Sequence, residues 1–215
     1  MNTPDNRPTF SIVIGVHDQA EEIAQNLPSL LTQQFEGDYE VIVVDESSTD
    51  ETVDVLKRLK SSHPHLYTTF LPKYHFQKNR RRLAFTLGVK AAKHQWVVFI
   101  DISTPPPSEG WLQELAEAVG PSIEMLLGYI QQKSGDMRLQ AFGSIDEARA
   151  IVNKAERSRA NGHSGHWLRY LRGKYDFLVV RTRQGHEALR LFDCDLRGHR
   201  LLGQRVGIFF HNLFH

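Results

Sequence analysis

Residues 41–51 read VIVVDESSTDE, and this stretch decides the fold. Its first four residues form a continuous apolar, β-branched run, which is typical of a strand covered on both faces. Asp45 closes the run, and Ser48 and Glu51 have the spacing of a capping box, which predicts the start of a helix at this point. A buried strand that leads directly into a helix predicts a βα unit of a parallel sheet.

The same pattern recurs along the first hundred residues. Similar apolar runs predict further strands at residues 10–16, 67–71 and 96–100, and apolar residues at helical spacing lie between the runs. The helix around residues 23–31 contains Pro28, which is predicted to bend or split it. Four βα alternations predict an α/β fold: a three-layer sandwich with a mainly parallel central sheet and a Rossmann-like nucleotide-binding half.

The second half of the chain is less periodic. Residues 125–130 and 175–180 are predicted strands, whereas residues 132–174 are polar and show no clear period. Near the end, apolar residues from Leu202 to Leu213 fall on one face of a predicted amphipathic helix.

Composition places the chain among ordinary globular proteins. Of its 215 residues, 40% are hydrophobic and 24% are charged, and the formal net charge is +1. A single cysteine, Cys194, excludes an intramolecular disulfide and fits a reducing compartment. No apolar run approaches the roughly 20 residues of a membrane span, and the first residues lack signal-peptide features, so we expect a cytoplasmic protein.

The charge is unevenly distributed. Residues 151–215 carry 12 basic and 5 acidic side chains, net +7. This excess predicts an anionic partner, and charge alone leaves open a phosphate, a nucleic acid or an acidic membrane surface.

Polar side chains follow three of the predicted strands. His17 and Asp18 follow the first, Asp45 the second, and Asp101 and Ser103 the fourth. Ligands of parallel α/β proteins bind beyond the carboxyl ends of the strands, so these residues are candidates for a ligand site. The alternative is that each aspartate caps the helix that follows it.

A basic cluster, Lys78-Asn79-Arg80-Arg81-Arg82, opens the third predicted helix. Cations at a helix N-terminus oppose the helix dipole, which favours phosphate binding over a purely structural role. A solvated basic face is one alternative, and RNA binding with the aromatic residues 74–76 is another. The P-loop and dinucleotide-binding glycine motifs are absent from the sequence.

Four segments, taken in order, match one known pattern: SIVIGVHD (11–18), VIVVDESSTDET (41–52), RRLAFTLGVKAA (81–92) and WVVFIDISTPPPSEGWL (96–112). They resemble the opening of family 2 glycosyltransferases of the GT-A fold, in which S-I-V-I-P-V-Y-N, E-I-I-V-V-D-D-G-S-T-D-x-T and F-L-D-A-D-x-x-P-x-x-x-W-L stand at corresponding places. The resemblance covers about residues 9–130.

The resemblance implies roles for individual residues. Asp45 would contact the nucleotide base, and His17 would line the base pocket. Arg82 or its neighbours would face the diphosphate. Asp101 would be the first aspartate of the D-x-D motif, near the ribose, and the remaining candidate to bind Mg²⁺ or Mn²⁺.

Three departures from the family pattern accompany these matches. Gly15 replaces a proline, and residues 46–47 are Glu-Ser in place of Asp-Gly. Ser103 replaces the second aspartate of D-x-D, and a neutral hydroxyl is a much weaker ligand for a divalent cation. We count Gly15 and Ser103 among the nucleotide-binding positions, and we expect the metal to bind weakly and only together with the nucleotide.

The resemblance does not identify a catalytic base. The family's later Glu-Asp base motif is not recognisable, and the acidic residues after Asp176 are Glu187, Asp193 and Asp195. These three are the candidates for the carboxylate that deprotonates the acceptor hydroxyl.

The implied function is sugar transfer from a UDP- or GDP-sugar to a carbohydrate or lipid-linked acceptor, with inversion, as in polysaccharide biosynthesis. Residues 1–130 would bind the nucleotide sugar, and residues 131–215 would form a shortened, basic acceptor side of the same domain. The basic tail would allow peripheral contact with the anionic inner membrane face. Two alternatives stay open: a catalytically impaired nucleotide-sugar-binding protein, and an RNA-binding domain that uses Lys78–Arg82. Of the possible partners, nucleic acid is the least expected.

Overall fold

The computed structural model describes residues 7–72, 80–130, 136–150 and 175–191. The predicted C-terminal helix, Cys194, Lys78, Asp193 and Asp195 lie outside the described residues.

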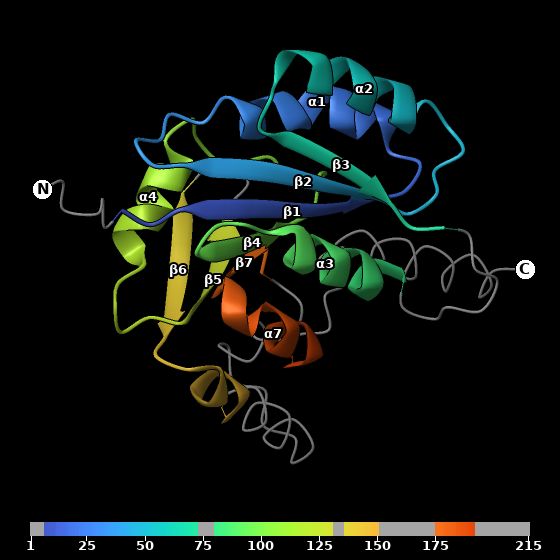
Figure 1. Ribbon diagram of the computed structural model, residues 1–215. Coiled ribbons are helices and arrows are strands. Elements are labelled where there is room, and N and C mark those ends of the chain that lie inside the picture. Colours follow the sequence, from blue (N-terminus) through green and yellow to red (C-terminus); the bar gives the residue numbers. More distant parts are fainter. Residues whose placement is uncertain (1–6, 73–79, 131–135, 151–174, 192–215) are drawn as a thin grey trace, which may run out of the picture.

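One seven-stranded sheet organises the molecule, with strand order β3-β2-β1-β4-β7-β5-β6 (Figure 1). Its strands are β1 (Phe10–Val16), β2 (Tyr39–Asp45), β3 (Leu66–Phe70), β4 (Trp96–Ile100), β5 (Met125–Ile130), β6 (Met137–Phe142) and β7 (Phe177–Arg181). The first four strands pair in parallel, whereas β7 pairs antiparallel with β4 and β5, and β6 pairs antiparallel with β5. Five strands therefore run in one direction, and the predicted α/β class with its mainly parallel sheet is confirmed.

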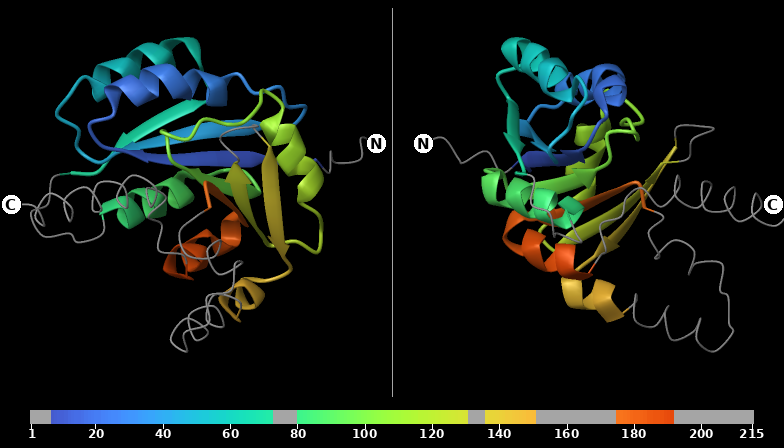
Figure 2. Two further views of the ribbon diagram at one scale, coloured as in Figure 1. Left: turned by 180° about the vertical axis from the view of Figure 1, so that it is seen from behind. Right: turned by 90° about the vertical axis from the view of Figure 1, so that its right-hand side faces the viewer.

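Helices cover both faces of this sheet. Figure 1 shows α1 (Ala20–Leu31) and α2 (Thr52–Ser62) on one side, and α3 (Arg80–Ala91) and α7 (Gly185–Leu191) on the other. The second view in Figure 2 shows the same layers. Helix α4 (Trp111–Ala118) follows β4, the short 3₁₀ helix η1 (Thr182–Gln184) precedes α7, and a helix begins at residue 145.

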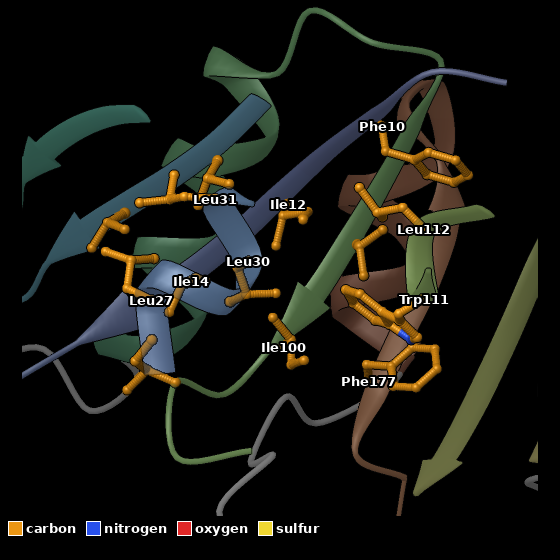
Figure 3. Packing of buried hydrophobic residues seen from close by; sticks show 14 of the residues in the cluster. Phe10, Ile12, Ile14, Leu27, Leu30, Leu31, Ile100, Trp111, Leu112 and Phe177 are labelled. Carbon is orange, nitrogen blue, oxygen red and sulfur yellow. The ribbon is translucent and has the colours of Figure 1, made fainter. Parts of the chain in front are cut away.

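Two apolar clusters separate the layers, one on each face of the sheet. Figure 3 shows the cluster under α1, α2 and α4, where Trp111 packs edge-on against Phe177 with ring centroids 5.1 Å apart. The other cluster joins α3 and α7 to the opposite face, because strand residues alternate between faces. There Gly88 lets α3 approach β1 closely, since a Cβ at that position would lie 2.1 Å from Val13 Cγ1.

Helix α1 runs through Pro28 as one helix, so the predicted split does not occur. Two other local expectations were wrong. Helix α2 begins at Thr52 and has no capping box, because the Ser48 hydroxyl bonds elsewhere and Asp50 Oδ1 accepts the Thr52 N–H at 3.0 Å. Strand β6 lies within the stretch in which the sequence shows no period, and its mostly half-exposed edge position explains the weak pattern.

Candidate functional site

Three loops meet where parallel strands β1, β2 and β4 end. The strands are neighbours in the sheet, and Val16, the last residue of β1, is in register with Asp45, the last residue of β2. The Glu46 N–H donates to the Val16 carbonyl at 2.8 Å, which joins the two loops. The polar residues predicted to follow the strands are therefore brought to one edge of the sheet.

Asp45 is fixed within this edge by its own loop. Its Oδ1 accepts hydrogen bonds from the Ser48 N–H at 2.9 Å and from the Ser48 hydroxyl at 2.6 Å. The carboxylate is 7% exposed, and its Oδ2 has no hydrogen-bond partner among the described residues. An oriented carboxylate with an available oxygen can accept a hydrogen bond from a base N–H.

A cavity of about 550 Å³ adjoins Asp45 between α2, β2 and β3. Phe70, which is in register with Asp45, is 67% exposed and presents an apolar ring beside it. Aromatic faces are suitable surfaces for stacking a base. The cavity is lined by Asp45, Ser47, Val53, Leu56, Lys57, Thr68, Thr69, Phe70 and Pro72.

The loop after β1 is held by the carboxylate of Asp18. Its Oδ1 accepts the Thr49 N–H at 2.6 Å and the Asp50 N–H at 3.3 Å, and the nearby His17 Nε2 lies 3.5 Å from Oδ2. The hydrogen bond from Thr49, assisted by the charge of His17, lowers the pKa of Asp18 below its ordinary value. Exposed His17 is thus placed at this edge, on a loop that is tied to the loop after β2.

On the α3 face of the sheet, Arg81 joins all three strand ends. Its guanidinium bonds to Asp101 Oδ2 and to the Gly15 carbonyl, and its Nη1 lies 3.7 Å from Glu46 Oε1. The side chains of Asp101 and Glu46 are 2% and 6% exposed, and that of Arg81 is 12% exposed. Buried carboxylates are stable when a partner of opposite charge is hydrogen-bonded to them, and Arg81 supplies that partner for Asp101.

Gly15 provides the space for this arrangement. A Cβ at Gly15 would lie 3.1 Å from Glu46 Oε1 and 3.2 Å from Arg81 Nη1. A larger residue would therefore displace the guanidinium, the glutamate or both.

The arginines at the start of α3 point toward the protein. Arg80 Nη2 donates to the Glu46 carbonyl at 2.6 Å and lies 3.3 Å from the Ser47 hydroxyl, while the Arg82 carbonyl accepts a hydrogen bond from the Thr86 hydroxyl. The sequence predicts that Arg82 or one of its neighbours faces the diphosphate. The structure places two of these neighbours, Arg80 and Arg81, at the strand ends. Two members of the basic cluster are thus committed to this edge and do not form a solvated basic face.

Asp101 is bonded through both carboxylate oxygens. Oδ1 accepts the Ser103 N–H at 2.9 Å and the Ser103 hydroxyl at 2.6 Å, and Oδ2 bonds to Arg81. In the part of the chain that the structure describes, there is no group of three or more His, Cys, Asp or Glu residues that could hold a metal ion. Because Ser103 and Arg81 occupy both oxygens of Asp101, and Ser103 supplies no charge, this carboxylate does not fit a divalent cation as it is bonded here.

Glu187 lies away from the strand-end cluster. Arg181, the last residue of β7, is in register with Trp96 at the start of β4, so α7 begins at the opposite edge of the sheet. Glu187 Oε1 accepts a hydrogen bond from Arg149 at 2.7 Å. Its interpretation as the catalytic base is not supported by this position, and the other two candidates lie outside the described residues.

Sequence reasoning missed two features of the site. It gave no role to Phe70, because the exposure of an aromatic residue at the end of an edge strand is not visible in an apolar pattern. It noted Glu46 only as a departure from a family pattern. Strand alternation from Asp45 could have placed Glu46 on the α3 face, opposite the cavity and toward the basic cluster.

The three-layer fold and a polar site at the carboxyl ends of β1, β2 and β4 define an α/β protein with a candidate ligand site at its strand ends. The family model "Glycosyl transferase family 2" matches residues 11–194, so the chain belongs to that family. The match extends well beyond residue 130, where the recognisable resemblance ended.

Curated relatives include larger enzymes. The chain is 30% identical over 105 residues to poly(ribitol-phosphate) beta-glucosyltransferase of Bacillus spizizenii, covering 48% of this chain and 16% of that protein. It is 31% identical over 119 residues to chondroitin synthase of Escherichia coli, covering 54% and 17% respectively. The chain thus spans about a sixth of the length of these relatives.

Solved structures share the fold. A mannosyltransferase from Pyrobaculum calidifontis, in complex with GDP-Man and Mn²⁺, aligns with a TM-score of 0.53 and 18% identity over 87% of this chain and 47% of that one. Glucosyl-3-phosphoglycerate synthase from Mycobacterium tuberculosis, in complex with Mn²⁺, UDP and phosphoglyceric acid, aligns with a TM-score of 0.52 and 15% identity over 82% of this chain and 56% of that one.

No described helix is long and apolar enough to cross a membrane.

Proposed function

We propose that the chain is a glycosyltransferase that takes a sugar from a nucleotide-diphosphate donor, a UDP- or GDP-sugar, and transfers it with inversion to a carbohydrate or lipid-linked acceptor. The observation that carries this proposal is the convergence of Asp45, Arg81 and Asp101 at one edge of the sheet, together with the cavity of about 550 Å³ that Asp45 lines. Family membership and the nucleotide complexes of the structural neighbours support it.

The geometry suggests how a donor would be held. Asp45 Oδ2 would accept a hydrogen bond from the base, and the Phe70 ring would stack against it. On the other side of β2, Arg80 and Arg81 would bind the diphosphate, since guanidinium groups form paired hydrogen bonds with phosphate oxygens. Neutralising the diphosphate helps it to depart when the sugar is transferred.

A second candidate is nucleotide-sugar binding without turnover. It is favoured by the position of Glu187, which is at the opposite edge of the sheet and bonded to Arg149. Transfer to a hydroxyl needs a carboxylate base within hydrogen-bond reach of it. Release of UDP from a UDP-sugar in the presence of carbohydrate acceptors distinguishes an enzyme from a binding protein.

Two further expectations belong to the proposal. Mg²⁺ or Mn²⁺ would add little to nucleotide binding, since Ser103 supplies no charge and Arg81 already bonds to Asp101 Oδ2. The protein would work in the cytoplasm and touch the anionic inner membrane face through its basic C-terminal segment. Co-sedimentation with anionic vesicles, compared with a variant lacking residues 201–215, tests the membrane contact.

Calorimetric titration of the whole chain with UDP, GDP and a short single-stranded RNA tests the function. We expect saturable binding of one of the two nucleotides and a loss of at least tenfold in affinity in Asp45→Ala. Asp146→Ala is the matched control, because Asp146 is an exposed aspartate that pairs with Arg149 and does not line the cavity. Tight RNA binding with a steep salt dependence, and no binding of either nucleotide, would favour the RNA-binding alternative.

A further inference from the structure

Three departures from the family 2 pattern surround one side chain. Gly15, in place of proline, opens the space that Arg81 occupies and offers it a carbonyl oxygen. Glu46, in place of aspartate, lies 3.7 Å from Arg81 Nη1. Ser103, in place of the second aspartate of D-x-D, holds Asp101 Oδ1 while Oδ2 bonds to Arg81. Two of these changes thus contact a single guanidinium, and the third holds the carboxylate that bonds to it.

We propose that Arg81 replaces the divalent metal of this site, so that the chain binds the diphosphate of its donor without a metal ion. The inference rests on the proposed function and states how that same site neutralises its substrate. Arg81 would bridge Asp101 and the diphosphate, because guanidinium forks bind carboxylate and phosphate oxygens alike.

The charges of the cluster agree with this replacement. In a full D-x-D motif, two carboxylates balance the charge of a divalent cation. Here the single carboxylate of Asp101 balances the single positive charge of the Arg81 guanidinium. The cluster has a second carboxylate, Glu46, and a second arginine, Arg80, which donates to the Glu46 backbone carbonyl at 2.6 Å. Replacing Ser103 by aspartate without removing Arg81 would leave one unbalanced negative charge in the cluster.

Burial keeps the Arg81 guanidinium in place. The side chain of Asp101 is 2% exposed and is hydrogen-bonded to Arg81, so removal of the guanidinium would leave a buried carboxylate without its ion-pair partner. Arg81 extends from α3, which Gly88 holds close against β1. The Arg81 guanidinium is therefore part of the fold and is present before the nucleotide binds.

The experiment titrates UDP, GDP and inorganic pyrophosphate into the whole chain, each once in the presence of EDTA and once in the presence of Mn²⁺. We expect wild-type affinities in EDTA to lie within about threefold of those in Mn²⁺. Arg81→Met should lose at least tenfold in EDTA, and Arg81→Lys should lose less because it keeps the charge. Arg149→Met is the control, since Arg149 is an exposed arginine paired with Asp146 and Glu187.

A double variant, Arg81→Met with Ser103→Asp, sharpens the comparison. It restores the two-carboxylate pattern and removes the guanidinium, so its UDP or GDP affinity should rise at least tenfold when Mn²⁺ replaces EDTA. Wild-type affinity that rises tenfold or more with Mn²⁺ would overturn the inference and leave the proposed function intact. Binding of neither nucleotide under either condition would contradict the proposed function and this inference together.

Discussion

The two halves of the sheet differ in what they bury. Every buried polar or charged residue that the structure describes lies between Ser11 and Asp101, in the parallel half formed by β1 to β4 and its loops. In the half formed by β5, β6 and β7, the described buried side chains are apolar or aromatic, such as Phe177 and Leu178. Buried polar groups cost free energy unless they are hydrogen-bonded, so the parallel half needs a network that the other half does not.

Strand direction explains the difference. Parallel strands bring the ends of β1, β2 and β4 to one edge, where polar groups from distant segments can cooperate. Antiparallel strands place successive loops at opposite edges, as with Arg181 beside Trp96. The parallel half therefore carries the candidate ligand site, and the other half mainly extends the core.

The largest expected effect is a loss of stability that leaves the site unchanged. Phe142→Ala removes a buried ring of β6, which is paired with Met125 at the edge of the sheet where β4 starts, and should lower the free energy of unfolding by about 3–5 kcal/mol. Phe99→Ala, on β4 and packed against Phe85 at 5.1 Å, should cost a similar amount. Urea denaturation measures both, and only Phe99→Ala should also weaken nucleotide affinity in the folded protein. An equal loss of affinity in Phe142→Ala would remove the distinction between the two halves.

A smaller loss should follow from breaking the buried ion pair. Asp101→Asn removes the charge that bonds to Arg81 and should cost about 2 kcal/mol of stability, because hydrogen bonds to charged groups are stronger than neutral ones. Asp146→Asn makes the same change in an exposed pair with Arg149 and should cost less than about 0.5 kcal/mol. Thermal or urea unfolding of both variants tests the comparison, and equal costs would show that the Arg81 cluster is not stabilising.

Ser47 tests the backbone of the loop after β2. Its φ of 64° lies in the left-handed region, and its hydroxyl bonds to the Leu71 carbonyl and lies near Arg80. Ser47→Ala keeps the strained backbone and loses the hydrogen bond, which should cost about 1 kcal/mol. Ser47→Gly loses the same bond but relieves the strain, so its free energy of unfolding should stay closer to that of wild type. The reverse order of the two variants would contradict this account.

The smallest effect concerns pH. The pKa of Asp18 is lowered mainly by the Thr49 N–H, so the stabilisation that its ionised form provides is present above its ordinary value of 3.8 and is lost as pH falls below that value. Wild type should therefore lose more stability than Asp18→Asn between about pH 5 and pH 3. Urea midpoints measured at several pH values test this, and parallel curves for the two proteins would contradict it.

The parallel half could be predicted closely from the sequence. Short apolar runs bounded by polar residues place β1, β2, β3 and β4 within two residues of their observed bounds, because strands buried on both faces leave a clear pattern. Strand β6 was missed, since an edge strand with half-exposed side chains lacks that pattern. The directions of β5 and β7 could not be predicted, because pairing direction is set by tertiary contacts.

The candidate site was predictable by position but not in its contacts. Asp45 and Asp101 were expected at the strand ends, and they lie there. The sequence alone could not show which arginine of residues 80–82 reaches Asp101, because the rotation of α3 depends on its packing at Gly88 and Phe85. The same limit applies to Gly15, whose contact with Arg81 joins segments 66 residues apart.

The central claim is that Arg81 holds the place of a metal at the donor diphosphate. A crystal structure of the chain with its nucleotide and Mn²⁺, with diffraction recorded at the manganese absorption edge, tests it most directly. We predict a diphosphate bound to Arg81, with Arg81 still bonded to Asp101 and no anomalous peak between Asp101 and the phosphates. A manganese peak at that position, with Arg81 withdrawn from Asp101, would contradict the account.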